Sequence, residues 1–200
     1  MKISNELTSP LFPLSINVLP GAYLPLQIFE PRYIDMIRRC LSNSEGFCVV
    51  LSKEESLASE QAFSSYHDIG TYVEIVDFNQ LDNGLLGITV KGKSKIKIQE
   101  AWKQDDELLL GKINEIDEED CDLSKEPEYL DLWNMVDEIT NHPEIKKLNL
   151  EVDLKSSKSV SYILASVLPL RSQEKQTILE LNDNREKLDY LKEIIKKLGG

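Results

Sequence analysis

The sequence predicts an α+β fold, with a β-rich N-terminal half and a helical C-terminal half. Three observations lead to this prediction. Short apolar runs and period-two alternation dominate residues 1–115, acidic side chains crowd residues 116–124, and apolar stripes at helical spacing fill residues 125–200. We therefore expect a β-rich subdomain, an acidic solvated linker and a helical subdomain with these boundaries. Two hundred residues suffice for two small subdomains.

The β-rich half opens with two apolar runs, residues 11–19 and 24–29, separated by a Pro-Gly turn. Pro13 and Pro25 should keep these strands short or at sheet edges, since proline cannot donate to a ladder. A helix is then expected from Pro31, because proline suits the first helical turn. Its apolar stripe comprises Tyr33, Ile34, Ile37 and Leu41, and the helix should end near Ser42-Asn43.

Residues 47–51 form a continuous apolar run that predicts a buried strand, and residues 52–68 should form a polar surface excursion. The Asn83-Gly84 pair predicts a hairpin with a type I′ turn. Further strands are expected at residues 71–78, 85–90, 94–99 and 107–116.

Four helices are expected after the acidic linker, because apolar residues recur there at helical spacing. The first two stripes comprise Leu132, Trp133, Val136 and Ile139, and then Val160, Ile163, Leu164, Val167 and Leu168 before Pro169. Ser172 is expected to cap the third helix, which carries Ile178 and Leu179. Asp183 and Glu186 resemble a capping box that opens the fourth.

The composition disfavours several classes of function. With 35 acidic and 23 basic residues the net charge is −12, which disfavours nucleic acid and anionic membrane surfaces as partners. No apolar run approaches the ~18 residues of a membrane span, and the N-terminus has no secretory signal pattern. Cys40, Cys48 and Cys121 are an odd number without CxxC spacing, as expected for reduced thiols. We therefore expect a cytoplasmic protein.

Residues 87–94 match the phosphate-binding pattern GxxxxGK[ST], in which Lys93 and Ser94 would contact phosphate and magnesium. That chemistry needs a helix directly after the loop. Strand-like residues lie on both sides here, so we interpret residues 91–94 as a turn between two strands and expect no cofactor.

The sequence shows no catalytic constellation and no metal-binding motif. The two histidines, His67 and His142, carry no nucleophile signature around them, and Ser156 with Lys158 is better explained by helix capping and surface charge. The carboxylates of residues 117–122 lack the ligand pattern and glycine of a calcium loop. A hydrolase would need a Cys–His or Ser–Lys pair assembled by the fold.

Four lysines, Lys91, Lys93, Lys95 and Lys97, alternate along a predicted strand. They could form a basic stripe that contacts RNA. Because the chain is acidic, we favour the solvated face of a sheet whose other face carries Ile96 and Ile98.

Three segments, residues 11–41, 69–98 and 165–191, together resemble the N-terminal substrate-binding domain of Lon protease, in the family's order. The most specific part is Phe-Glu-Pro-Arg-Tyr at residues 29–33, with Phe-Pro-Leu upstream. One departure is Leu19, where relatives often carry phenylalanine.

The resemblance implies a PUA-like β-barrel-type subdomain followed by a helical bundle. In Lon the domain captures unfolded or tagged substrates for an ATPase ring and a Ser-Lys peptidase. Neither region is present in these residues, so we expect a stand-alone form. It would be a non-catalytic polypeptide-recognition module, a protease accessory or chaperone-like factor. Its expected partners are unfolded or specific protein substrates and a separate protease or ATPase.

Candidate polypeptide-binding residues are Tyr23, Glu30, Arg32 and Tyr33. The competing interpretation of residues 29–33 is structural: the phenylalanine packs, the proline starts the helix, and the Glu and Arg pair or cap backbone. An RNA-binding PUA-like protein, relying on Lys93, Lys95 and Lys97, is the alternative function.

Overall fold

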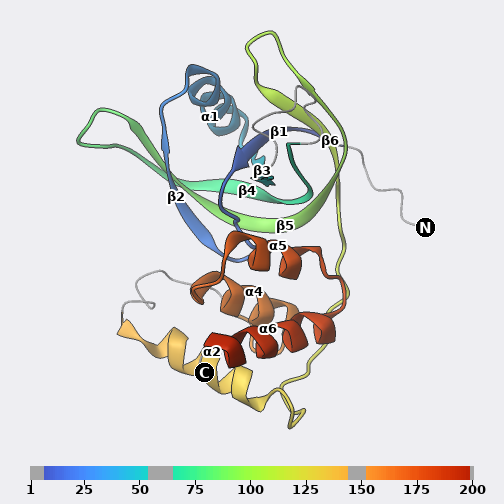
Figure 1. Cartoon of the computed structure of the whole chain (residues 1–200). Coiled ribbons are helices and arrows are strands. Elements are labelled where there is room, and N and C mark those ends of the chain that lie inside the picture. The colour runs from blue at the N-terminus through green and yellow to red at the C-terminus, as the bar shows by residue number, and fades with distance from the viewer. Residues whose placement is uncertain (1–6, 54–64, 144–151, 199–200) are drawn as a thin grey trace. The chain divides into compact units, whose positions relative to one another are not determined.

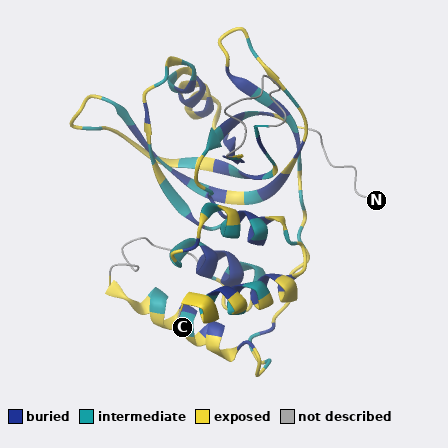
Figure 2. Cartoon of the chain, viewed as in Figure 1, coloured by how far each residue is buried: buried dark blue, intermediate teal, exposed yellow. Residues whose placement is uncertain are grey.

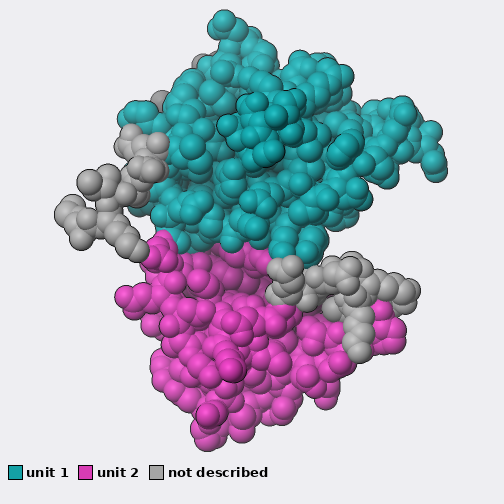
Figure 3. Space-filling view, turned by 180° about the vertical axis from the view of Figure 1, so that it is seen from behind, with its two compact units in different colours: residues 1–18, 23–116 teal, residues 19–22, 117–200 magenta. Residues whose placement is uncertain are grey.

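The chain forms two compact units in the computed structural model, which describes residues 7–53, 65–143 and 152–198. The first, here called the barrel unit, comprises residues 1–18 and 23–116. The second, the helical unit, comprises residues 19–22 and 117–200, and Figure 3 colours the two separately. The predicted strand-rich and helical halves are therefore present, and the α+β class is confirmed. The acidic segment and the Pro-Gly turn both belong to the helical unit.

The barrel unit is a six-stranded sheet with one helix, drawn in Figure 1. Its elements are β1 (Leu7–Leu14), β2 (Tyr23–Ile28), α1 (Pro31–Asn43), β3 (Phe47–Ser52), β4 (Tyr66–Gln80), β5 (Leu86–Lys103) and β6 (Leu109–Glu115). The strand order is β2-β5-β4-β3-β1-β6, and β5 also pairs with β6. This extra pairing closes five strands into a ring and leaves β2 attached to the outside of β5.

Strands β1 and β3 are parallel, so the chain between them must cross over, and it does so through β2 and α1. Strand β3 is buried on both faces, as its continuous apolar run predicts. Phe47 and Val49 belong to one core cluster with α1, whereas Cys48 and Val50 belong to a second cluster. Successive side chains of a strand point to opposite faces, which explains this division.

Pro13 and Pro25, the two prolines predicted to limit their strands, lie where the ladder needs no donor. Strand β2, with Pro25, pairs with β5 alone among the described strands, so the predicted edge position is confirmed. Strand β1 lies between two neighbours, but its pairing with β6 ends at Pro10, and Leu11–Leu14 pairs only with β3. Pro13 therefore occupies a local edge.

The turn predicted at residues 91–94 is wrong, because β5 runs through these residues without interruption. The register with β4 shifts there: Ser94 lies opposite Tyr72 and Gly92 opposite Val73, which leaves Lys93 as the extra residue of a β-bulge. Bulges bend a strand, and this bend helps β5 pair with β2 at one end and β6 at the other. Because residues 87–94 are part of this strand, they do not form a phosphate-binding loop.

The β4–β5 hairpin forms at the predicted residues, but with a different turn. A type I′ turn needs positive φ at both central residues. Only Gly84 has positive φ here (81°), and its N–H donates to the carbonyl of Leu81. Asn83 instead accepts the N–H of Leu85 through its side chain. The turn is therefore of type I, followed by a left-handed glycine.

Helix α1 begins at Pro31 and ends at Asn43, with Ser44 in the left-handed conformation (φ 56°), which confirms its predicted limits. Its buried face is rotated from the predicted stripe. Leu41 is 39% exposed, while Cys40 packs in the core. The buried residues are Tyr33, Met36, Ile37 and Cys40.

The helical unit contains α2 (Leu130–Asn141), α4 (Ser157–Val167), α5 (Ser172–Glu180) and α6 (Asn184–Leu198). Helix α4 is the centre of this unit, and α2, α5 and α6 each pack against it. It is buried over most of its length in Figure 2, including the predicted Val160, Ile163 and Leu164. No described helix of the chain is long and apolar enough to cross a membrane.

Side chains bond to backbone N–H groups at the starts of α5 and α6, whereas α1 and α2 have no side-chain cap. Asp183 accepts the N–H groups of Arg185 and Glu186, which confirms the predicted cap of α6. Ser172, the predicted cap of α5, is instead its first helical residue. Glu174 accepts the N–H of Arg171, the residue before the helix, at 2.9 Å.

The acidic segment is not wholly solvated. The Glu118 carboxylate is 4% exposed and pairs with the ammonium group of Lys187, which is fully buried. The hydroxyl of Tyr162 donates to both Glu118 oxygens, at 2.7 and 2.8 Å. Asp120 accepts the N–H of Lys158 in the first turn of α4, where a negative charge is favourable. Part of the acidity therefore anchors the segment to the helices.

Candidate functional site

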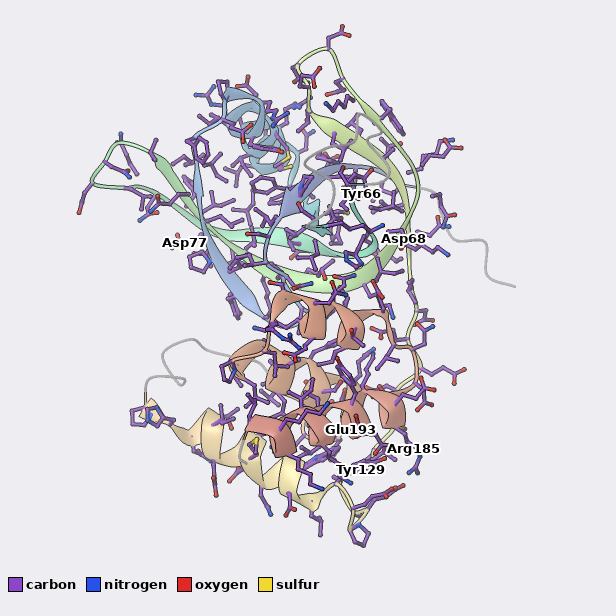
Figure 4. The ribbon with its side chains drawn as sticks, viewed as in Figure 1. Tyr66, Asp68, Asp77, Tyr129, Arg185 and Glu193 are labelled. Carbon is purple, nitrogen blue, oxygen red and sulfur yellow. The ribbon has the colours of Figure 1, made fainter. Side chains whose placement is uncertain are left out.

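The barrel unit contains a groove of about 470 Å³, here called the barrel groove. Ser65 and Tyr66, from the end of the predicted excursion at residues 52–68, border it, and residues 54–64 lie outside the described part of the chain. Most of the lining is apolar and comes from β1, β2 and the start of β6. The apolar and aromatic lining residues are Phe12, Pro13, Leu14, Leu26, Ile28, Phe29, Tyr33, Tyr66 and Leu109. Tyr66, labelled in Figure 4, contributes from the start of β4.

Packed aromatic rings underlie the barrel groove. The rings of Phe12 and Tyr33 pack with centroids 4.2 Å apart, and Phe12 also contacts Phe47 at 5.9 Å. Burial raises the pKa of the Tyr33 hydroxyl. Phe29 differs from these rings, because it is 66% exposed between β2 and α1. An exposed phenylalanine beside a buried aromatic floor is a feature of binding surfaces more than of cores.

Arg32 holds the polar side of the barrel groove together. Its guanidinium donates to the Glu30 carboxylate at 2.8 Å and to the backbone carbonyl of Glu107 at 2.9 Å. It also lies 4.9 Å from the centre of the Tyr33 ring. Because Glu107 has a positive φ (63°), this bond fixes a strained loop between β5 and β6.

Lys103, the last residue of β5, and Glu107 on that loop form the outer rim, with Nζ and Oε2 2.7 Å apart. The hydrogen bond from Lys103 lowers the pKa of the Glu107 carboxyl. The rim therefore carries charges of both signs, while the interior of the groove is apolar.

Three of the four predicted binding residues, Glu30, Arg32 and Tyr33, line the barrel groove. Tyr23 does not. Its ring lies under the ammonium group of Lys91, 5.4 Å away, at the start of β2. The contacts of Arg32 fit the structural interpretation of this motif, since its fork is satisfied within the barrel unit.

Sequence reasoning missed the other side of the groove, from β1 and the β5–β6 loop. Phe12 and Leu14 belong to the Phe-Pro-Leu signature upstream of the motif, and this signal could have identified them. No sequence signal points to Lys103 or Glu107, because only the hairpin geometry brings them to α1.

The described residues hold no cluster of three or more metal-ligating side chains. The thiol of Cys40 donates to the carbonyl of Gly46 and that of Cys48 to the hydroxyl of Ser9, not to a histidine. Burial raises the pKa of Cys40 to about 11 and that of Cys48 to about 12, so neither is a ready nucleophile.

The predicted lysine stripe does not form a single solvated face. Lys95 is 1% exposed, and Lys93 at the bulge pairs with Glu74, with Nζ and Oε2 3.2 Å apart. Ile96 and Ile98 are buried as predicted. A bulge shifts the side-chain phase by one residue, which breaks the alternation on which the RNA-binding alternative relied.

Comparison with known proteins gives one consistent result. The sequence model described as "ATP-dependent protease La (LON) substrate-binding domain" matches residues 8–197. The chain is 24% identical to Lon protease of Cytophaga hutchinsonii over 198 residues, covering 94% of this chain and 24% of that protein. It is 24% identical to Lon protease of Escherichia coli K12 over 196 residues, with the same coverage of both. It thus spans about a quarter of the length of the curated relatives it matches.

Two solved structures are similar over almost their whole length. A Lon N-terminal domain protein from Xanthomonas campestris matches with a TM-score of 0.75 and 26% identity, covering 92% of this chain and 96% of that one. The N-terminal domain of Mycobacterium avium complex Lon protease matches with a TM-score of 0.68 and 16% identity, at the same coverage. The second likeness concerns the fold alone.

Proposed function

Since this chain belongs to the Lon substrate-binding domain family, we propose that it is a non-catalytic module that recognises exposed apolar segments of polypeptides. It acts in the cytoplasm on unfolded or specific protein substrates, as a protease accessory or chaperone-like factor. The buried free thiols Cys40 and Cys48 are compatible with a reducing compartment.

The observation that carries this proposal is the barrel groove. Its apolar lining, with Phe29 exposed at the family's most specific motif, suits the insertion of apolar side chains. Strand β2 supplies Leu26, Gln27 and Ile28 to the lining and has one strand neighbour among the described residues. An extended peptide could add hydrogen bonds at such an edge while its side chains enter the groove.

Phe29 should make a measurable contribution to the affinity for a bound polypeptide. Fully burying a phenylalanine stabilises a complex by about 1.5–3 kcal/mol, and two-thirds of this side chain is available for burial. The contact should therefore contribute roughly 1–2 kcal/mol, or about a 5- to 30-fold change in affinity. Because Phe29 is exposed in the free chain, its removal should leave folding nearly unchanged.

The test is binding of a reduced, carboxymethylated polypeptide that cannot fold, compared with its folded parent, without nucleotide. We expect preference for the unfolded form and a 5- to 30-fold loss with Phe29→Ala. Phe78→Ala is the matched control, because Phe78 is 60% exposed on β4 and does not line the groove. Equal affinity for both forms, or equal losses in the two variants, would refute the proposal.

A further inference from the structure

The helical unit has a second groove of about 600 Å³, between α2 and α6. We call it the helix groove. Both helices pack against α4, and side chains from each line the groove. Its apolar part consists of Leu132 and Met135 from α2 and Ile195 from α6. Leu132 is buried, whereas the other two are half-buried and available for contact.

The rim of the helix groove is mainly acidic. Glu128, Asp131, Asp189 and Glu193 border it, together with Lys192 and Lys196. Figure 4 shows Tyr129, Arg185 and Glu193 on the same side of the helical unit.

Three of these six charged side chains are already engaged. Asp189 accepts the hydroxyl of Tyr129 at 3.1 Å, and the Lys192 ammonium group lies 5.1 Å from the centre of the same ring. Glu128 lies 3.5 Å from Arg185. Each of these contacts holds a rim side chain in place, so that this side chain gains less from binding a ligand.

The carboxylates of Asp131 and Glu193 differ from these engaged side chains. Neither forms an ion pair or side-chain hydrogen bond with another described residue. One stands on each wall of the groove, on α2 and α6 respectively. The rim as a whole has four carboxylates against two ammonium groups, and two of the carboxylates have no partner among the described residues. Such a rim around an apolar floor is complementary to a ligand with an apolar stripe and flanking cations.

We propose that the helix groove docks a cationic amphipathic helix of a partner protein. An extended strand is a poorer occupant, because α2 and α6 satisfy their own backbone groups and offer no free edge. A docked helix likewise satisfies its own backbone. Helix α2 has 12 residues and thus spans about 18 Å, enough to contact three turns. The net charge of −12 opposes a second copy of this chain as the occupant.

The probe is a labelled 18-residue peptide with leucines on one helical face and lysines flanking them. Its binding to the full chain is followed by fluorescence anisotropy. We expect Asp131→Lys and Glu193→Lys each to weaken binding about tenfold. Asp137→Lys, on another side of α2, and Glu119→Lys, outside the groove, make the same change in net charge and should weaken it less than twofold. Phe29→Ala should have no effect, which separates this site from the barrel groove.

Two comparison peptides complete the test. Replacing every lysine by glutamate should abolish binding, and scrambling the sequence so that the leucine stripe is lost should weaken it at least tenfold. The proposal is overturned by equal losses in the groove variants and their controls, by equal binding of the glutamate or scrambled peptide, or by no saturable binding up to about 1 mM.

Discussion

Replacing Lys187 by methionine should destabilise the helical unit strongly, although methionine fills a similar volume. Lys187 is fully buried on α6, and its ammonium group pairs with the Glu118 carboxylate and donates to the hydroxyl of Tyr162 at 3.0 Å. Burial lowers the pKa of Lys187, while the Glu118 carboxylate opposes this shift. Burial also raises the pKa of Tyr162, with the Glu118 charge acting in the same direction.

The magnitude follows from the charge that remains. In the Lys187→Met protein, Glu118 keeps the Tyr162 hydroxyl but loses its cation while only 4% exposed. Removing one partner of a buried ion pair typically costs about 3–5 kcal/mol. This is a large part of the ~5–15 kcal/mol that stabilises a typical domain. Lys196→Met, at an exposed position on α6, should cost less than about 0.5 kcal/mol.

The assay is urea denaturation at pH 7, followed by tryptophan fluorescence and circular dichroism. Trp133 reports on the helical unit, because its indole N–H donates to the carbonyl of Leu154 at 2.8 Å. The Glu118→Gln/Lys187→Met double variant should recover at least 1 kcal/mol relative to Lys187→Met, since the buried charge that lost its Lys187 partner is also removed. A cost below about 1 kcal/mol for Lys187→Met, or no recovery in the double variant, would refute the reasoning.

The remaining predictions concern thiol reactivity, a helix cap and a close backbone approach. Native protein at pH 8 should release one equivalent of thionitrobenzoate rapidly, from exposed Cys121, and three only in denaturant. Burial raises the thiol pKa of Cys40 and Cys48 to about 11 and 12, so their contribution to stability should be complete below about pH 9 and decline between pH 9 and 12. The opposite slope of urea stability against pH, or fast reaction of all three thiols, contradicts these expectations. Asp183→Ala should lower stability by about 1 kcal/mol and Asp183→Asn by much less, because asparagine also caps helices; equal melting temperatures would contradict this. Gly70→Ala should cost about 1–3 kcal/mol, since its Cβ would lie 2.6 Å from the Val49 carbonyl oxygen; an unchanged urea midpoint would disprove the clash.

Local patterns were sufficient for most helices and strands. The start of α1 at proline, the doubly buried β3 and the capped α6 all follow from residues adjacent in the sequence. The patterns failed where neighbouring strands decide the geometry. Lys93 is the extra residue of a β-bulge because the register between β4 and β5 shifts there. Nothing in the lysine alternation indicates this shift.

The candidate site was predicted only in part, because local patterns identify residues within one segment but not residues that the fold brings together. Glu30, Arg32 and Tyr33 are contiguous with the family's specific motif, so the sequence identified them. Glu107 lies 75 residues from Arg32 and reaches it only through the β5–β6 hairpin. Tyr23 was also predicted as a binding residue, but it lies outside the barrel groove.

The sequence by itself determined the α+β class, the order of elements and the family, because these depend on periodicity and on motifs within single segments. Only the tertiary structure decided which charges are solvated and which are buried. Glu118 appears in an acidic run like its neighbours, yet it pairs with Lys187, 69 residues away. The physical reason is that desolvation and ion pairing depend on distances in space, which a chain fixes only when its segments pack together.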